Sequence, residues 1–337
     1  MILVTGGTGL VGAHLLYQLV SSNQNVKATY KDQKSLEKTA RIFSYYTTNH
    51  KALFKKITWV KANLTNLPEL TLAFNKITQV YHCAAYINFD PRAFNTLKKI
   101  NIEGTANIVN LCLAYNIEKL CYVSSIATLG TTVKDTLVTE RNVWNPETDN
   151  NVYAISKYGA EMEVWRATQE GLNAVIVNPG VIIGPGNWDS GTGQLFKKAN
   201  KGLKYYTTGT VALVDVNDVV NIMILLLNSS IKNKRFIVVA KNETYKTFLN
   251  TLCNAVNRKA PKKTATALLL KAAWILDWIK SGIMRTPRSI TKQMANTLLS
   301  KTTYSNAAIK DALNYNFKDI ETTIVNTGKI FLKEHHK

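Results

Sequence analysis

The strongest constraint on the fold is a regular alternation of short apolar runs with helix-like segments in the first half of the chain. Runs of strand length between helix-periodic segments are typical of β-α-β units. Such units give a parallel sheet with helices on both faces, because their crossovers are right-handed. The sequence therefore predicts an α/β, doubly wound parallel sheet. Strands are expected at residues 2–5, 25–30, 57–62, 79–83, 120–124 and 174–178, and helices at 11–21, 98–115 and 153–170.

The segment "VTGGTGLVGAHL", residues 4–15, joins the first strand to the first helix. Gly7, Gly9 and Gly12 match G-x-G-x-x-G, and Gly6, Gly9 and Gly12 match G-x-x-G-x-x-G. Backbone N–H groups and the helix dipole make such a helix start an anion site, and glycines let phosphate oxygens approach the backbone. We interpret the turn as the pyrophosphate site of a dinucleotide. A glycine-rich turn without a ligand is the alternative.

The end of the second strand should contact the adenosine ribose of that dinucleotide. The segment reads "VKATYKDQK", so Lys31 follows the strand and Asp32 comes one position later. A basic residue there accepts a 2′-phosphate, whereas an acid accepts hydrogen bonds from the 2′-hydroxyl and repels the phosphate. We therefore expect NADP rather than NAD, with Lys31 as the phosphate partner. In the alternative, Lys31 is solvated and Asp32 binds the ribose.

The pattern changes after residue 178. The segment "NPGVIIGPGNWDSGTG" is rich in glycine and proline, which marks a loop that bends sharply or approaches a partner closely. A strand-helix unit follows at 211–227 and a strand at 236–240, and the rest is mostly helical. We predict a Rossmann NADP-binding domain at 1–178, to which 208–240 return. A smaller, mostly helical substrate-binding lobe is expected at 179–207 and 241–337.

The segment "YAISK" supplies Tyr153 and Lys157, which share one helix face because they are four residues apart. A nearby ammonium and an oxidised nicotinamide would stabilise the tyrosine as a phenolate, so that it can exchange a proton with a substrate oxygen. Ser124 and Ser125 end the fifth strand, and strand carboxyl ends face the ligand crevice. A surface helix pair is the alternative, but the glycine turn and the serine favour a catalytic site.

These pieces resemble the extended short-chain dehydrogenases/reductases of the NAD(P)-dependent epimerase/dehydratase superfamily. The resemblance rests on "TGGTGLVG", "HCAA", "NIEGTANIVNLC", "VSSIATLG", "YAISK", "NPGVIIGPG" and "VDVNDV", in order over about residues 1–230. It implies a catalytic triad of Ser125, Tyr153 and Lys157, with Asn101 supporting a proton relay through water.

The resemblance also implies a set of cofactor contacts. Asn63 stands where the family usually has an aspartate at the adenine amino group, and its carbonyl can still accept that hydrogen bond. Lys157 is expected to bond the nicotinamide ribose. The remaining expected contacts are Gly6, Thr8, Gly9, Leu10, Val11, Gly12, Leu64, Ala84, Ala85, Tyr153, Pro179, Gly180 and Val181.

Two features favour the carbonyl-reductase branch of this superfamily over the nucleotide-sugar branch. "SSIATLG" lacks the acids of sugar-nucleotide dehydratases, and Val211 stands where epimerases usually carry an arginine that clamps the substrate diphosphate. Other segments resemble dihydroflavonol-4-reductase-like and 3β-hydroxysteroid-dehydrogenase-like proteins. We expect an NADP-dependent oxidoreductase that reduces a ketone or aldehyde, or oxidises the matching alcohol. A nucleotide-sugar epimerase/dehydratase and a non-catalytic NADP-binding sensor are the alternatives, and Lys197 or Lys204 could replace the arginine.

The segment "TATALLLKAAWILDWIKSGIM" carries one apolar helical stripe, Leu268, Ala272, Ile275 and Ile279, with Trp274 and Trp278 beside it. Three interpretations compete, in this order of preference. The stripe packs on the second lobe, it forms a wall of an apolar substrate pocket, or it is an interfacial membrane helix. Membrane contact is therefore not expected, and no apolar run is long enough to cross a bilayer.

The net charge of +20 comes from scattered lysines without a basic block, which indicates a solvated surface and no nucleic-acid partner. Cys83, Cys112, Cys121 and Cys253 form no CxxC pair, so free thiols in a reducing cytoplasm are expected, with no metal site. No secretory signal is recognised at the start of the sequence. The expected partner is a small carbonyl or alcohol substrate, with a homodimer as the candidate assembly.

Overall fold

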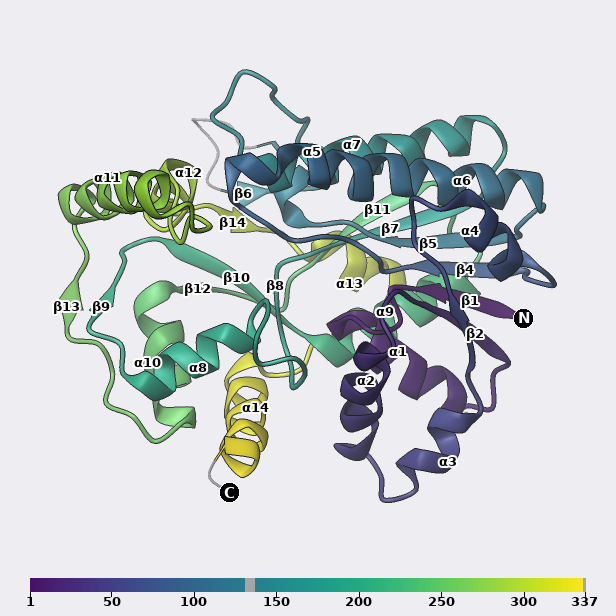
Figure 1. Ribbon diagram of the computed structural model, residues 1–337, viewed down its shortest axis with the longest axis horizontal. Coiled ribbons are helices and arrows are strands. Elements are labelled where there is room, and N and C mark those ends of the chain that lie inside the picture. Colours follow the sequence, from purple (N-terminus) through teal and green to yellow (C-terminus); the bar gives the residue numbers. More distant parts are fainter. Residues whose placement is uncertain (131–136, 336–337) are drawn as a thin grey trace.

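The computed structural model describes residues 1–130 and 137–335 of the chain (Figure 1). Its centre is a seven-stranded sheet in the order β11-β7-β5-β4-β1-β2-β3, and every neighbouring pair is parallel. The predicted doubly wound α/β fold is confirmed. The strands are β1 (Ile2–Thr5), β2 (Val26–Tyr30), β3 (Thr58–Lys61), β4 (Gln79–His82), β5 (Lys119–Val123), β7 (Ala174–Pro179) and β11 (Lys234–Val238).

Helices cover both faces of this sheet, because alternate strand residues point to opposite sides. In β1, Ile2 and Val4 belong to one buried core and Leu3 to the other. The first core is closed by α1 (Leu10–Ser21) and α9 (Val216–Asn228). The second is closed by α4 (Leu67–Phe74), α6 (Gly104–Ala114) and α7 (Val152–Gln169). Figure 1 shows α6 and α7 above the sheet and α1 below it.

The sheet changes direction of winding between β1 and β4. The chain runs outward from β1 through β2 to β3 and then returns to β4 on the other side of β1. Ligands of open α/β sheets bind beyond the strand carboxyl ends at such a switch point. The glycine turn after β1 and the loop after β4 therefore border the expected crevice.

The helix expected at 98–115 is longer and less regular than the sequence indicated. It begins with α5 (Phe94–Leu97), passes through a π-helical stretch at Lys98–Glu103, and continues as α6. π-Helical turns are frequent at functional sites. Asn101 lies within this stretch.

A second lobe is built on a three-stranded sheet in the order β12-β10-β8, which lies at the left of Figure 1. Its strands are β8 (Val181–Ile183), β10 (Thr210–Asp215) and β12 (Lys241–Thr244). Helices α8 (Gly193–Lys201), α10 (Tyr245–Ala255) and α14 (Ile320–His335) share a third core with it. Of the segment 208–240, α9 and β11 return to the main sheet, whereas β10 pairs within the lobe.

The carboxyl-terminal part is mostly helical, as the sequence indicated. Beyond α10 it contains α11 (Ala267–Met284), α12 (Lys292–Thr297) and α13 (Ala307–Leu313), and α13 packs beside the main sheet through Ile309. The helices α2 (Lys34–Ser44) and α3 (His50–Lys55) lie between β2 and β3. The four cysteines are unpaired. Within residues 1–130 and 137–335, no helix has the length and hydropathy needed to span a bilayer.

Candidate active site

The glycine turn connects β1 to α1 with almost no space for side chains. Gly6 has a φ of 68°, and a Cβ there would lie 2.6 Å from the backbone of Ala84. A Cβ on Gly12 would lie 2.2 Å from the carbonyl oxygen of Gly6. These contacts explain why the turn consists of glycine and why it lies directly against the loop after β4.

The first turn of α1 offers free backbone donors to a ligand. Gly9 is the N-cap of the helix, and no side chain caps it. The N–H groups at Leu10 and Val11 therefore begin a helix whose positive dipole end points into the switch-point crevice. Thr8 is half-buried beside them. The donor set and the missing side chains fit a pyrophosphate group.

Lys157 is held inside the protein by β5. Its side chain is 1% exposed, and Nζ donates to Tyr122 Oη at 2.7 Å and to the carbonyl oxygen of Val123 at 2.8 Å. Burial lowers the pKa of Lys157 from 10.5 to about 7, although the nearby Glu161 and Cys83 act in the opposite direction. The charge of this ammonium is therefore sensitive to pH near neutrality.

Tyr153 lies at the start of α7, one helical turn before Lys157. Asn151 caps this helix end by accepting the Ala154 N–H at 2.8 Å. Burial raises the pKa of Tyr153 to about 12, and a side-chain hydrogen bond with Ser125 lowers it in part. The phenol is thus protonated near neutral pH and able to donate a proton.

Ser125 follows β5 and is fixed by its own backbone environment. Its Oγ accepts the Ala127 N–H at 3.1 Å and so caps the short helical turn Ile126–Thr128. The strand itself ends at Val123, one residue earlier than the sequence indicated, so Ser124 and Ser125 both lie in the turn beyond it. A side-chain hydrogen bond joins Ser125 to Tyr153. Lys157 of α7 is bonded to the end of the same strand through Tyr122 and Val123.

Glu161 is a buried carboxylate that joins several polar groups near the site, and the sequence alone did not indicate this role. Its carboxylate is fully buried, and Oε2 accepts hydrogen bonds from Ser124 at 2.5 Å, Thr128 at 2.8 Å and Asn178 at 2.9 Å. Its Oε1 pairs with Arg235 of β11 at 3.1 Å. Glu161 therefore ties α7 to the residues at the carboxyl ends of β5 and β7 and to the start of β11. The sequence signal for Glu161 is its spacing of four residues from Lys157, which places both side chains on one face of the helix.

Asn101 holds the loop after β4 rather than pointing freely into a cleft. Its Oδ1 accepts the Tyr86 N–H at 2.7 Å, and Nδ2 donates to the Tyr86 carbonyl at 2.9 Å and to Ser156 Oγ at 3.0 Å. The side chain is 1% exposed. Its amide thus joins the loop to α7 immediately beside Lys157, and a role in a water relay stays a prediction.

The expected adenosine contacts lie after β2 and β3. Lys31 is exposed, whereas the carboxylate of Asp32 accepts the Lys34 N–H at 3.2 Å within its own turn. Asn63 Oδ1 accepts the backbone N–H and the hydroxyl of Thr65, each at 3.3 Å. Asn63 also lines a pocket of about 350 Å³. Asn63 Oδ1 thus already accepts two hydrogen bonds from Thr65, and a hydrogen bond from adenine would be a third on the same oxygen.

The remaining expected contacts lie in the loop after β4 and between the two sheets. Ala84 abuts Gly6, Ala85 is exposed, and Leu64 is buried against Gly104. Pro179 ends β7 and Val181 begins β8, so the chain passes from the main sheet to the small sheet at Gly180. A Cβ on Gly180 would lie 2.5 Å from the Ala212 carbonyl oxygen, which explains the glycine at this crossing.

Comparisons with known proteins agree with this architecture. The model of the NAD dependent epimerase/dehydratase family matches residues 2–240. A Synechocystis sp. protein named for dihydroflavonol 4-reductase is 28% identical over 293 residues, covering 84% of this chain and 81% of the relative. The crystal structure of gox2253 superimposes with a TM-score of 0.81 at 22% identity, covering 99% of this chain and 98% of the other. Yeast methylglyoxal/isovaleraldehyde reductase Gre2, complexed with NADPH, has a TM-score of 0.74 at 19% identity, with 99% of each chain covered.

Proposed function

Because the chain belongs to the NAD-dependent epimerase/dehydratase family, we propose that it uses NADP to reduce a ketone or aldehyde through Ser125, Tyr153 and Lys157. At the level of the family, it is an NAD(P)-dependent oxidoreductase of the extended short-chain dehydrogenase/reductase type. The observation that carries the proposal is the Tyr153 phenol hydrogen-bonded to Ser125, on the same helix as the buried Lys157. A phenol that keeps its proton near neutral pH is available as the general acid that reduction of a carbonyl requires.

Each residue of the triad has a distinct task in this proposal. When bound, the reduced nicotinamide supplies a hydride to the carbonyl carbon. Ser125 donates a hydrogen bond to the carbonyl oxygen, and Tyr153 Oη transfers its proton to that oxygen to give the alcohol. Lys157, when protonated, stabilises the phenolate that remains. The glycines of the β1–α1 turn and the backbone at Leu10 and Val11 would hold the pyrophosphate.

The preference for NADP rests on the end of β2. Lys31 is exposed directly after the strand, and the carboxylate of Asp32 is engaged with the Lys34 N–H. Lys31 offers a cation to a 2′-phosphate at this strand end, while Asp32, which is also exposed, has one carboxylate oxygen bonded to the Lys34 N–H. NADPH should bind more tightly than NADH, and Lys31→Ala should narrow the difference, while Lys38→Ala on α2 should not. Equal affinities of the wild type for both cofactors would refute this preference.

The proposed substrate is an uncharged, mostly apolar carbonyl compound. Val211 is 5% exposed in the centre of the small sheet, so no cation stands where a nucleotide-sugar enzyme would clamp a diphosphate. Of the two lysines that could replace the arginine, Lys197 is paired with Asp189, whereas Lys204 is exposed and keeps that alternative open. The names of the Synechocystis relative and of the yeast structure point to the same reaction class. A nucleotide-sugar epimerase is the second candidate, because the family model is named for epimerases and dehydratases and one similar structure is a UDP-glucose 4-epimerase with UDP-glucose.

The direct test offers the protein a panel of aldehydes and ketones and measures the oxidation of NADPH by its loss of absorbance. Tyr153→Phe should lower kcat by on the order of 10² or more while cofactor affinity is retained. Tyr158→Phe is the matched control, because this ring lies one turn later on α7 and stacks on Trp144 instead. Full activity of Tyr153→Phe would refute the assigned proton transfer. Inactivity on all carbonyls together with turnover of a UDP-sugar would favour the epimerase, and cofactor binding without turnover would favour a sensor.

A further inference from the structure

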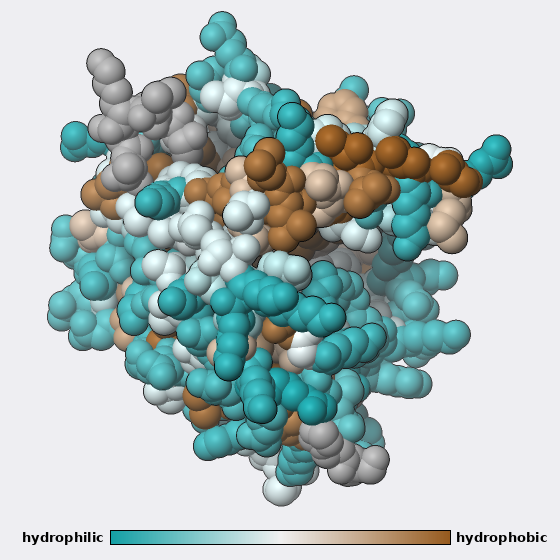
Figure 2. All heavy atoms as spheres, turned by 90° about the vertical axis from the view of Figure 1, so that its left-hand side faces the viewer, coloured by the Kyte–Doolittle hydropathy of each residue, from teal (hydrophilic) through white to brown (hydrophobic). Residues whose placement is uncertain are grey.

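Helix α11 turns its apolar side outward. Leu268 and Ile283 are each 79% exposed and Leu276 is 65% exposed, whereas the polar Ser281 is 3% exposed. The stripe noted in the sequence, Leu268, Ala272, Ile275 and Ile279, lies on this outward side, with only Ile275 half-buried. The helix itself packs inward through Leu270 and Trp274, as the first interpretation expects, but this stripe faces away from that contact. Figure 2 shows hydrophobic residues as a band across the upper part of this side of the molecule, above a mostly hydrophilic surface.

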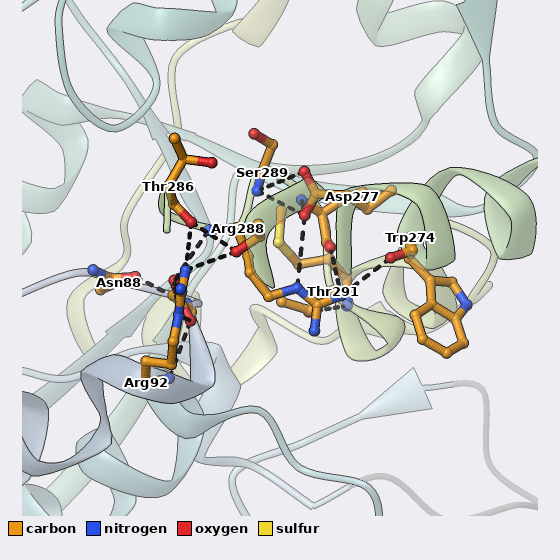
Figure 3. Close-up of polar contacts among 12 residues, drawn as sticks. Asn88, Arg92, Trp274, Asp277, Thr286, Arg288, Ser289 and Thr291 are labelled. Carbon is orange, nitrogen blue, oxygen red and sulfur yellow. Dashed lines mark hydrogen bonds and ion pairs between the residues drawn. The ribbon is translucent and has the colours of Figure 1, made fainter. Parts of the chain in front are cut away.

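Polar contacts on the inward side fix the rotation of α11 about its axis. Asp277 accepts the Ser289 N–H at 3.1 Å and pairs with Arg288 at 3.6 Å. Arg92 donates to Ser281 Oγ at 2.9 Å and to the Thr286 carbonyl at 2.6 Å. Figure 3 shows these side chains converging between α11 and the segment after it. The inward side of α11 thus combines these polar contacts with the apolar packing of Leu270 and Trp274, and the opposite apolar face is left outside.

Basic residues surround this outward face. Lys271 and Lys280 are exposed and, on a helical projection, lie on opposite flanks of the apolar stripe. Lys262 and Lys263 precede the helix, and Arg285 follows it, and all three are exposed. The exposed apolar stripe, the lysines on its flanks and the exposed Trp278 are residue types that helices in a membrane interface also carry.

A second copy of this chain fits the same face poorly. The net charge of +20, with lysines on both flanks of the stripe, would bring like charges together. The helix has 18 residues, so its face is about 27 Å long and roughly 10 Å wide. That area of roughly 300 Å² is well below the ~800 Å² that each partner buries in a stable dimer. An anionic surface complements the same charges instead.

We propose that α11 is an interfacial helix that binds the surface of a membrane containing anionic lipids. Leu268, Leu276, Ile279 and Ile283 enter the boundary between headgroups and acyl chains, and Lys271 and Lys280 contact the headgroups. Since α11 is not a bilayer-spanning helix, the binding is peripheral and reversible. This proposal places the interfacial interpretation, which the sequence ranked third, ahead of the other two. The inference does not depend on the proposed substrate.

The test is co-sedimentation of the full chain with vesicles of phosphatidylcholine alone and of phosphatidylcholine mixed with phosphatidylserine. The wild type should bind the mixed vesicles, more weakly at high salt. Leu276→Glu combined with Ile283→Glu should lower the partition coefficient roughly tenfold or more, because two apolar side chains leave the interface. Leu72→Glu is the matched control, since this leucine is equally exposed on α4, at 73%, and should leave binding unchanged.

A charge variant and the oligomeric state complete the test. Lys271→Glu with Lys280→Glu should weaken binding to the mixed vesicles, and all variants should keep the circular dichroism spectrum of the wild type. Three outcomes would overturn the proposal: no binding to the mixed vesicles, equal binding to neutral vesicles, or a dimer that Ile283→Glu dissociates. The last would assign the face to a second copy of the chain.

Discussion

Replacing Lys157 by methionine should make the stability of this protein less dependent on pH. The side chain is almost fully buried, and burial lowers its pKa from 10.5 to about 7. The unfolded chain therefore keeps the proton up to about pH 10, whereas the folded protein releases it above about pH 7. In this interval the unfolded state binds more protons, so the free energy of unfolding of the wild type rises with pH.

The size of the effect follows from the shift in pKa. One group contributes about 1.4 kcal/mol per pH unit where it is charged only in the unfolded state. Between pH 7 and pH 10 the contribution of Lys157 is thus roughly 3 to 4 kcal/mol. Below pH 7 both states carry the charge, and the cost of burying the ammonium is present in full. Lys157→Met removes this cost, and it also removes the hydrogen bonds to Tyr122 and Val123 at every pH.

Urea unfolding followed by tryptophan fluorescence at several pH values measures the difference between variant and wild type. The lost hydrogen bonds shift this difference by a constant, so only its slope with pH reports the buried charge. The free energy of unfolding of the variant minus that of the wild type should be largest at and below about pH 7 and should fall toward pH 10. Lys38→Met, at an exposed position on α2, is the control and should give no slope. A flat difference for Lys157→Met would refute the reasoning.

Three further substitutions test the surroundings of the site. Gly12→Ala should abolish cofactor binding in calorimetry and lower stability by about 1–3 kcal/mol, because its Cβ would meet the Gly6 carbonyl oxygen at 2.2 Å. Gly282→Ala on α11 is its control, since nothing lies within 4 Å of the added carbon, and it should raise the melting temperature slightly. Glu161→Gln should cost about 3 kcal/mol in urea unfolding, because it leaves Arg235 without its buried partner.

The main sheet could be predicted, and Ser125, Tyr153 and Lys157 could be proposed as a triad, because the signals for both are local. Strand-length apolar runs and a glycine turn are read within a few residues, and the Tyr153–Lys157 spacing follows from helix geometry alone. The sequence did not predict that β10 belongs to the small sheet, because the signal for this is not local. Its sequence looks like that of any strand before a helix, and only pairing with β8 and β12 distinguishes it.

The buried partners of the triad were out of reach because they come from distant segments. Tyr122 accepts from Lys157 across 35 positions, and Arg235 reaches Glu161 across 74. A single sequence shows that Glu161 shares a helix face with Lys157, but not that residues from three neighbouring strands and their loops contact it. Such convergence depends on the order of strands in the sheet.

Helix α11 shows that an apolar stripe recognised in the sequence can face outward in the structure. The stripe from Leu268 to Ile279 marks an amphipathic helix, and the usual inference is that the apolar side faces inward. That inference assumes that the opposite side, which includes Asp277 and Ser281, would be costly to bury. Here Arg288 pairs with Asp277, and Arg92, from far along the chain, donates to Ser281. Because these polar groups are paired, α11 can bury Asp277 and Ser281 beside Leu270 and Trp274, and the stripe is left to face whatever lies outside the protein.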